Sequence, residues 1–507
     1  MLSGRRQDLP GGVNGVLDLR TQKSERMGTA SQRRVARLIA FAGLLSWAGA
    51  AAAAPSRAEM DLAVRDLGAD HDRATNALYV LQSGGAPAAD AIEDAWPSLS
   101  RLAQKRAIGA LRSLAESHDA AVDALVAAAR SDDQQVRELG LAALRQSPQR
   151  GRQGLVELLP DPRVGDDAAS ALARTDPEFA ITPLLAAIAA KGGAERPALR
   201  DALSVAVLRA RAPGPKLHGW LRSEPPPASV ASAALALNNI EERRNEVATF
   251  VAYALRGADD FATAWRLLQS ARVAAPSVPI DRWVARQLTQ PEEWMLRAAA
   301  VDAVTARGRR EQARSALTDP YPRVRVHAAT ALAGDADSLI ERATLARKDT
   351  WPMVRAAAVQ SLRSEGNALP VILASVDDSM SVVRVAAIEA LTLAPHHEGW
   401  ERIHRRLRAK NEWPSVTRAA IAYVVAHCRT DAAESLFRVV LRAAPSNALT
   451  DDLNNAALAI EALRALGTPQ ANAVIEQLRA TPEVPPTLKM ALDQPLLDSG
   501  RCAADAS

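Results

Sequence analysis

The apolar positions of this chain follow one spacing over most of its length. A β-branched or aliphatic residue, the lead residue, is followed at +4 by a small or apolar residue and at +7 and +8 by a small-apolar pair, as in Val324/Ala328/Ala331/Leu332. These four positions lie on one face of an α-helix. The same spacing begins, about thirty residues apart in each run of neighbouring copies, at Ala103, Val136, Val164, Leu199, Leu296, Val354, Val383 and Thr417.

The spacing belongs to a longer self-similar unit. Residues 319–332 read Asp-Pro-Tyr-Pro-Arg-Val-Arg-Val-His-Ala-Ala-Thr-Ala-Leu, and worn copies follow at 349–362 and 378–391. After each copy comes a break, such as Gly334-Asp335, and then a second amphipathic segment. Repetition at this period predicts a stacked array of helix pairs.

Composition favours helices for the whole array. Aromatic residues make up 4% of the 507 residues, and Ala and Leu are abundant. Such a chain buries a continuous core through many small side chains in close helix contacts, and Ala and Leu are strong helix formers. We therefore predict an all-α fold.

The unit Asp-Pro-x-Pro-x-Val-Arg-x-x-Ala-x-x-Ala-Leu resembles the HEAT repeat, in particular its short bacterial form called phycobilisome-lyase HEAT-like. The resemblance covers roughly four-fifths of the chain. It implies a right-handed α-solenoid, a superhelix of about twelve stacked helix pairs. Because this repeat serves many roles, the resemblance implies a fold and not a function.

We expect four segments along the chain. Residues 1–54 form an N-terminal extension and signal peptide, residues 55–226 carry degenerate repeats, and residues 227–480 carry more regular ones. Residues 481–507 form a capping helix and a disordered tail. The division near 226 rests on the Pro-rich break at 224–227.

The first 54 residues contain an export signal. Arg33, Arg34 and Arg37 precede the apolar run 38–47, and the Ala-rich run 48–54 offers cleavage points. We interpret this order as a Sec-type signal peptide whose translation starts at Met27. The protein is then periplasmic or secreted, with no stable membrane span after cleavage. The alternative is an uncleaved inner-membrane anchor formed by residues 38–54.

Charge and cysteines narrow the function classes. Beyond residue 54 the chain has 54 basic and 55 acidic residues, so no overall field favours nucleic acid. The two cysteines, Cys428 and Cys502, have no metal-ligand spacing. We expect two free thiols, and a disulfide is the alternative for an exported chain.

One charged pattern recurs in phase with the repeat. Arginine directly follows the lead residue in seven copies, and an acid stands five residues before the lead residue in four. The acid can cap the helix, and an arginine of the neighbouring repeat can hold it bidentately. We interpret the pattern as a structural Arg–acid ladder; the alternative is an anion-binding strip. The ladder residues are Arg297, Arg325, Arg355, Arg384 and Arg418 with Asp319, Asp349, Asp378 and Glu412, and Arg137 and Arg200 share the arginine position.

An aromatic residue precedes proline at the start of several first helices. Proline is tolerated in the first turn, and we expect the aromatic ring to staple that turn to the core. The alternative is a stacking platform for sugars or peptides. The pairs are Trp96-Pro97, Tyr321-Pro322, Trp351-Pro352 and Trp413-Pro414.

Candidate chemistry is sparse. His396, His397 and His404 lie near Glu398 and Glu401, but this spacing favours a solvated polar turn over a metal site. We find no nucleophile elbow, P-loop or dinucleotide fingerprint. We therefore predict a non-catalytic scaffold without cofactor or metal, which binds another protein along its curved surface. The alternative is an enzyme or enzyme-accessory factor of the HEAT-like lyase type.

The segment 398–410 is the candidate partner-binding surface. Its cations outnumber its acids, and we expect the second helix of each pair to line the concave side, where extended ligands lie. This predicts an acidic partner; a solvated charged face is the alternative. The candidate residues are Trp400, Arg402, Arg405, Arg406 and Arg408.

Overall fold

The computed structural model describes residues 55–147, 149–393, 398–444, 448–494 and 502. Over these residues the regular structure is entirely helical, with 28 α-helices and no strands, which confirms the all-α prediction. The described chain divides into two compact units, one up to residue 110 and one from residue 111, and the boundary falls within α5. The predicted signal segment, 1–54, lies outside the described residues. None of the helices in the described part is long and apolar enough to cross a membrane.

Unit 1 contains the first helices of the described chain. Its helix α2 is capped by Ser56, whose hydroxyl accepts from the Glu59 N–H while the Glu59 carboxylate accepts from the Ser56 N–H. This capping box satisfies two N–H groups that a helix start leaves without partners. The helices are α2 (Arg57–Asp66), α3 (His71–Ser83), α4 (Gly85–Ala95) and the start of α5 (Arg101–Leu114).

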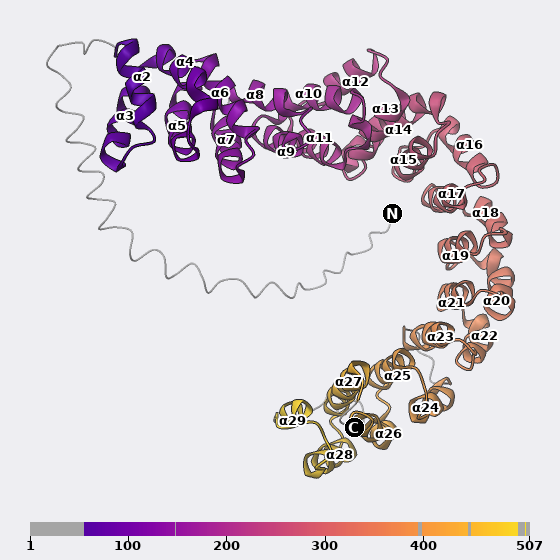
Figure 1. Cartoon of the computed structure of the whole chain (residues 1–507). Helices are drawn as coiled ribbons and strands as arrows, with labels where there is room; N and C mark the ends of the chain where they lie inside the picture. The colour runs from indigo at the N-terminus through magenta and orange to yellow at the C-terminus, as the bar shows by residue number, and fades with distance from the viewer. Residues whose placement is uncertain (1–54, 148, 394–397, 445–447, 495–501, 503–507) are drawn as a thin grey trace, which may run out of the picture. The chain divides into compact units, whose positions relative to one another are not determined.

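In unit 2 the helices form two layers. The first helix of each pair packs against the first helices of the neighbouring pairs, as Figure 1 shows for α17, α19, α21 and α23. This layer consists of α7 (Gln134–Gln146), α9 (Gly165–Thr175), α11 (Pro197–Arg209), α13 (Pro227–Ala236), α15 (Phe261–Ala271), α17 (Trp294–Ala306), α19 (Pro322–Ala331), α21 (Pro352–Ser361), α23 (Ser381–Leu393), α25 (Pro414–Ala426) and α27 (Thr450–Leu466).

The second helices form the other layer. From α18 to α24 they lie on the outer side of the bend that this stretch of unit 2 makes in Figure 1. The expectation that second helices line the concave side is therefore wrong for this stretch. The layer contains α6 (Asp119–Ala129), α8 (Gly151–Leu158), α10 (Pro177–Ala189), α12 (Gly214–Leu221), α14 (Arg244–Ala254), α16 (Val278–Gln287), α18 (Arg310–Ala313) with the 3₁₀ helix η5 (Arg314–Thr318), α20 (Leu339–Lys348), α22 (Leu369–Ser375), α24 (Trp400–Arg408), α26 (Ala433–Leu441) and α28 (Pro469–Ala480).

The repeated apolar spacing explains the first layer. Every lead residue that we located in the sequence is buried, including Leu296, Val324 and Val354. Small residues at +4 and +7, such as Ala328, let neighbouring helices approach closely while Leu at +8 fills the core. Glycine takes a left-handed conformation at the C-cap of α27, Gly467 (φ +59°), and shortly after α19, at Gly334 (φ +77°).

Packing continues across the Pro-rich break near 226. Helix α13 packs on α11, and the Tyr253 hydroxyl of α14 donates to the Pro225 carbonyl at 3.2 Å. The predicted division at 226 therefore rests only on how regular the repeats are in the sequence on either side of it. Near the C-terminus, α29 (Pro486–Leu492) packs on α27 and α28 within the segment predicted to cap the array.

The two cysteines form a disulfide. Cys428 follows α25, and Cys502 lies 74 residues later with its Cα 5.3 Å away. The expectation of two free thiols is wrong because the chain beyond α28 returns to the end of α25, where the Cys502 N–H donates to the Ala465 carbonyl of α27 at 3.4 Å. The disulfide closes a loop that contains α26 to α29.

Candidate partner-binding surfaces of the C-terminal repeats

Arginines bridge consecutive repeats at the start of the first helices. Arg325 donates from Nε and Nη2 to the Asp349 carboxylate at 2.8 and 3.0 Å. Arg297 holds Asp319 in the same bidentate way. Each of these carboxylates belongs to the turn before the next first helix, so each pair ties one repeat to the next. Equivalent pairs are Arg355–Asp378 and Arg384–Glu412.

A backbone carbonyl is the more constant partner of these arginines. Arg355 donates from Nη1 to the carbonyl of Asp349, six residues earlier, at 2.9 Å. The same bond to the carbonyl six residues earlier is made by Arg137 and Arg200, which lack the acid of the ladder. The shared role of these arginines is therefore to stabilise the turn that leads into their own helix. The same bond is made by Arg297, Arg325 and Arg384.

The acids of the ladder organise turns and do not cap helices. Asp349 Oδ1 accepts from the Trp351 N–H at 2.9 Å, and Trp351 is itself the residue before the first helical position of α21. The predicted capping role is therefore wrong, because the carboxylate bonds to an N–H ahead of the helix. Burial opposes ionisation of Asp378, but hydrogen bonds from Arg355 and the Met380 N–H outweigh it and lower the pKa of this carboxyl.

The ladder weakens at its C-terminal end. Arg418 contacts Asp451 at 3.2 Å, and both side chains are about half exposed. Exposed ion pairs contribute little, typically below ~1 kcal/mol. Arg418 occupies the predicted position in sequence but does not make a buried rung.

The rung at Arg355 can be tested by truncation. Arg355→Ala removes the donors of a nearly buried Asp378 and of the Asp349 carbonyl, so unfolding of these repeats should become easier by about 1–3 kcal/mol. The rung depends on a carboxyl of lowered pKa, so its contribution is present above pH ~4 and is lost as pH falls further. Denaturant titration of Arg355→Ala measures the loss of stability, and Arg408→Ala, a substitution of an exposed side chain, serves as the control. Equal losses would contradict a structural ladder.

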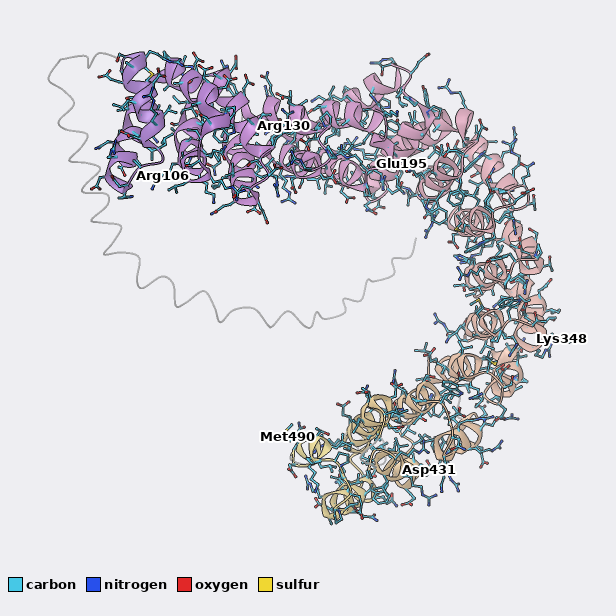
Figure 2. The ribbon with its side chains drawn as sticks, viewed as in Figure 1. Arg106, Arg130, Glu195, Lys348, Asp431 and Met490 are labelled. Carbon is cyan, nitrogen blue, oxygen red and sulfur yellow. A yellow bond between two sulfur atoms is a disulfide. The ribbon has the colours of Figure 1, made fainter. Side chains whose placement is uncertain are left out.

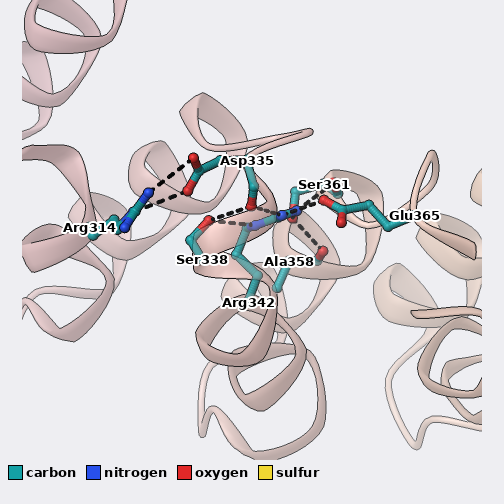
Figure 3. A network of polar contacts seen from close by, with 7 residues as sticks. All are labelled: Arg314, Asp335, Ser338, Arg342, Ala358, Ser361 and Glu365. Atoms are coloured by element: carbon teal, nitrogen blue, oxygen red, sulfur yellow. Dashed lines mark hydrogen bonds and ion pairs between the residues drawn. The ribbon is translucent and has the colours of Figure 1, made fainter. Parts of the chain in front are cut away.

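A second row of arginines, which the sequence did not reveal, joins the opposite ends of the first helices (Figure 3). Arg342 of α20 is fully buried and donates to the Ser361 and Asp335 carbonyls at 2.8 and 2.7 Å, and also to the Glu365 carboxylate. Arg314 donates from Nε and Nη2 to the Asp335 carboxylate at 3.2 and 3.3 Å. In both pairs, an arginine of a second helix meets an acid in the turn after the next first helix.

The basic face of α24 is partly neutralised. Arg402 and Arg406 both donate to Asp377 at 2.7 Å, and Arg406 also lies 3.5 Å from Glu412. Burial opposes ionisation of Asp377, but the hydrogen bonds from these two arginines lower the pKa of its carboxyl. Arg405 reaches Asp377 only at 3.8 Å and is mostly exposed, and Arg408 is exposed. The free charge of this face therefore lies on Arg405 and Arg408.

Trp400 does not belong to an exposed face. It is 6% exposed, donates from Nε1 to Asp431 at 2.6 Å (Asp431 is labelled in Figure 2), and stacks on His404 and Tyr423. Its position at the start of α24 faces α25, so its assignment to a partner surface is wrong. Burial raises the pKa of the Tyr423 phenol to about 12. The His404 Nε2 lies 2.7 Å from the hydroxyl of the buried Ser435.

Three aromatic rings of the aromatic-proline pairs are exposed. Tyr321 is 38% exposed, Trp351 52% and Trp413 63%, and only Trp96 is buried. Tyr321 stacks on Trp294 of the preceding repeat with ring centroids 4.8 Å apart. The prediction that these rings staple the first turn to the core is therefore wrong for Trp351 and Trp413, because the core below them is already filled by Val354 and its counterparts.

The histidine-rich turn offers no described metal centre. His396 and His397 lie outside the described residues. In the part of the chain that the structure covers, no three His, Cys, Asp or Glu side chains converge closely enough to hold a metal ion.

The sequence profile of HEAT repeats matches residues 311–392, the stretch that holds two complete rungs of the ladder, Arg325–Asp349 and Arg355–Asp378, and the Arg342 network. Over these residues the chain is therefore similar to HEAT repeats. Among curated proteins, none matches the chain.

Solved structures share the helical architecture at low identity. Two are of the karyopherin Kap121p, one of them bound to the extreme C-terminus of the protein phosphatase Cdc14p, at 12% and 11% identity with TM-scores of 0.44 and 0.42. They cover 85% and 88% of this chain, which spans 53% and 63% of theirs. An engineered protein is similar over 88% of this chain and 98% of its own, at 14% identity and a TM-score of 0.27. At these scores the likeness carries no argument about partners.

Proposed function

We propose that this HEAT-repeat chain is an exported, non-catalytic scaffold that binds another protein through its C-terminal repeats. The observation that carries the proposal is the exposure of large apolar side chains at the repeat turns, such as Trp351 and Trp413. Exposed aromatic residues gathered on one surface are typical of protein interfaces. Elsewhere in these repeats the lead residues and their partners are buried, so the exposed rings are not needed for the core.

An acidic surface on the partner suits the neighbouring charges. Arg405 and Arg408 on α24 are exposed, and two acids of the adjacent turns, Asp377 and Glu412, are already engaged by Arg402 and Arg406. Arginine is enriched where protein surfaces meet, since its planar fork binds carboxylates bidentately. The α24 face is therefore proposed as the part of the interface that selects an acidic partner.

Export is supported by the order of residues 33–54 and by the disulfide. Structural disulfides persist in oxidising compartments and are rare in the cytosol. The Cys428–Cys502 bond joins distant parts of the array, as expected of a protein that folds outside the cytosol.

Photo-crosslinking in living cells tests both parts of this proposal. A photoreactive residue placed at position 405, 351 or 413 of the full chain should capture one protein, and the crosslinked chain should begin between Ala51 and Ser56 by amino-terminal sequencing. Arg405→Glu with Arg408→Glu should abolish capture at position 351 without changing thermal melting. The same residue at position 145, on α7, serves as the matched control. A cytosolic chain that retains Met27 would contradict export, and no capture at the three positions would contradict the scaffold.

A further inference from the structure

One edge of repeats 319–415 carries a row of exposed apolar side chains. They stand immediately before the first helix of each pair, or at its second position. Their sequence positions recur with the repeat, so each occupies an equivalent place in successive turns. We call Tyr321, Trp351, Met353, Met380, Val382 and Trp413 the apolar row; each is between 38% and 63% exposed.

The ladder fixes the turns that carry this row side by side. Arg325 bonds to the Asp319 carbonyl in its own turn and to the Asp349 carboxylate in the next. One guanidinium therefore separates the turn of Tyr321 from the turn of Trp351. Arg355 and Arg384 join the following turns in the same way, through Asp378 and Glu412. The apolar row thus occupies four consecutive turns, from Tyr321 to Trp413.

The charge along this edge is positive at the surface. Its five acids, which lie in the four turns, are all engaged in ion pairs with arginine. Two second helices, α20 and α24, end at the same edge with exposed cations, among them Lys348 at the end of α20, labelled in Figure 2. Cations at helix C-termini also meet the negative end of the helix dipole. The engaged acids are Asp319, Asp349, Asp377, Asp378 and Glu412, and the exposed cations are Arg347, Lys348, Arg405, Arg408 and Lys410.

The spacing of the row limits the shape of a ligand. Packed helices lie about 8–10 Å apart, so the four turns span roughly 24–30 Å. An extended or polyproline II segment advances about 3.1–3.4 Å per residue and therefore meets a new turn at about every third residue. A helical ligand advances about 5.4 Å per turn, so only about every second turn of the ligand would meet a turn of the row.

We propose that the apolar row binds an extended segment of the partner that has a large apolar residue at every third position and acidic residues between them. This inference rests on the proposed function and adds the chemistry and conformation of the bound segment. The apolar side chains of the segment lie against Tyr321, Trp351 and Trp413. Its carboxylates face the cations at the ends of α20 and α24.

Synthetic peptides test the inference directly on the full mature chain. The probe is a fluorescent twelve-residue peptide of four Leu-Pro-Glu units, and binding is followed by fluorescence anisotropy. Two comparison peptides are four Leu-Pro-Lys units and an isomer of the probe in which the four leucines stand next to one another. The acidic probe should bind at least tenfold more tightly than either, and its affinity should fall as salt rises.

Variants locate the binding surface. Trp351→Ala with Trp413→Ala should weaken probe binding at least tenfold, whereas Trp265→Ala, an exposed tryptophan of α15, should leave it unchanged. Lys348→Glu with Arg408→Glu should weaken it similarly, and Arg145→Glu should not. All these side chains are exposed, and unchanged thermal melting verifies the fold.

The outcomes separate this inference from the proposed function. No binding of the probe, equal binding of either comparison peptide, or binding unaffected by the tryptophan variants would overturn the extended-segment inference. The scaffold would stand in each case if crosslinking at position 405 still captured a protein. Single-stranded DNA serves as a competitor for the probe. If it displaced the probe at the same concentration from the wild type and from the tryptophan variants, the surface would be a non-specific cationic one, and the inference would be overturned.

Discussion

Replacing Arg342 by methionine is expected to destabilise repeats α20–α21 by about 3–5 kcal/mol. The side chain is fully buried and supplies donors to the Glu365 carboxylate and to the carbonyls of Asp335 and Ser361. Methionine matches part of its volume but leaves a nearly buried carboxylate without its cation. Because stacked repeats open locally, amide hydrogen exchange in α20 and α21 is the suitable measurement, and protection should fall more than a hundredfold.

Two companion variants show whether the loss comes from the stranded charge. Arg347→Met changes an exposed arginine of the same helix and should alter stability by no more than about 0.5 kcal/mol. Arg342→Met combined with Glu365→Gln removes the buried charge as well and should recover part of the lost protection. Wild-type protection in Arg342→Met alone would mean that the network in Figure 3 contributes no net stability.

Removing the disulfide is expected to destabilise the C-terminal repeats by about 2–4 kcal/mol. The bond joins cysteines 74 residues apart, and cross-linking a loop of that length restricts the unfolded chain strongly. The loss should be concentrated in α26 to α29, which the loop contains. Denaturant unfolding of Cys428→Ser with Cys502→Ser, compared with the oxidised wild type, measures it.

The reducing agent provides the matched control. Dithiothreitol should lower the stability of the wild type to that of the double variant and leave the double variant unchanged. If both cysteines of the native, air-oxidised protein reacted with a thiol-labelling reagent, the disulfide would be contradicted.

The first-helix layer could be predicted from the sequence because its determinants are local. The spacing that begins at Leu296 or Val354 defines one helical face, and proline at the first helical position marks where α19, α21 and α25 begin. These signals lie within one turn or two of the residues they control. Their repetition at one period also predicted the stacking, since a single pair cannot bury its own apolar face.

The Arg–acid ladder could be predicted from the sequence only in part. The phase of Arg355 and Asp378 in the sequence indicated a pair across neighbouring repeats, and the structure brings these two side chains together. The bond from Arg355 to the Asp349 carbonyl was not visible, since no residue type marks a carbonyl acceptor. Arg418 shows the converse, because its position in the repeat matches but the next repeat presents only an exposed Asp451.

Burial of polar and aromatic side chains was decided by the tertiary structure. Arg342 and Arg405 both stand in cation-bearing second helices, yet one is fully buried and the other mostly exposed. Trp400 and Trp351 were assigned the wrong way round, the first to the surface and the second to the core. A periodic pattern defines the face of a helix, whereas the surroundings of that face come from repeats about thirty residues away. The meeting of Cys428 with Cys502 required the whole path of α26 to α29, and a local pattern carries no information about so long a return.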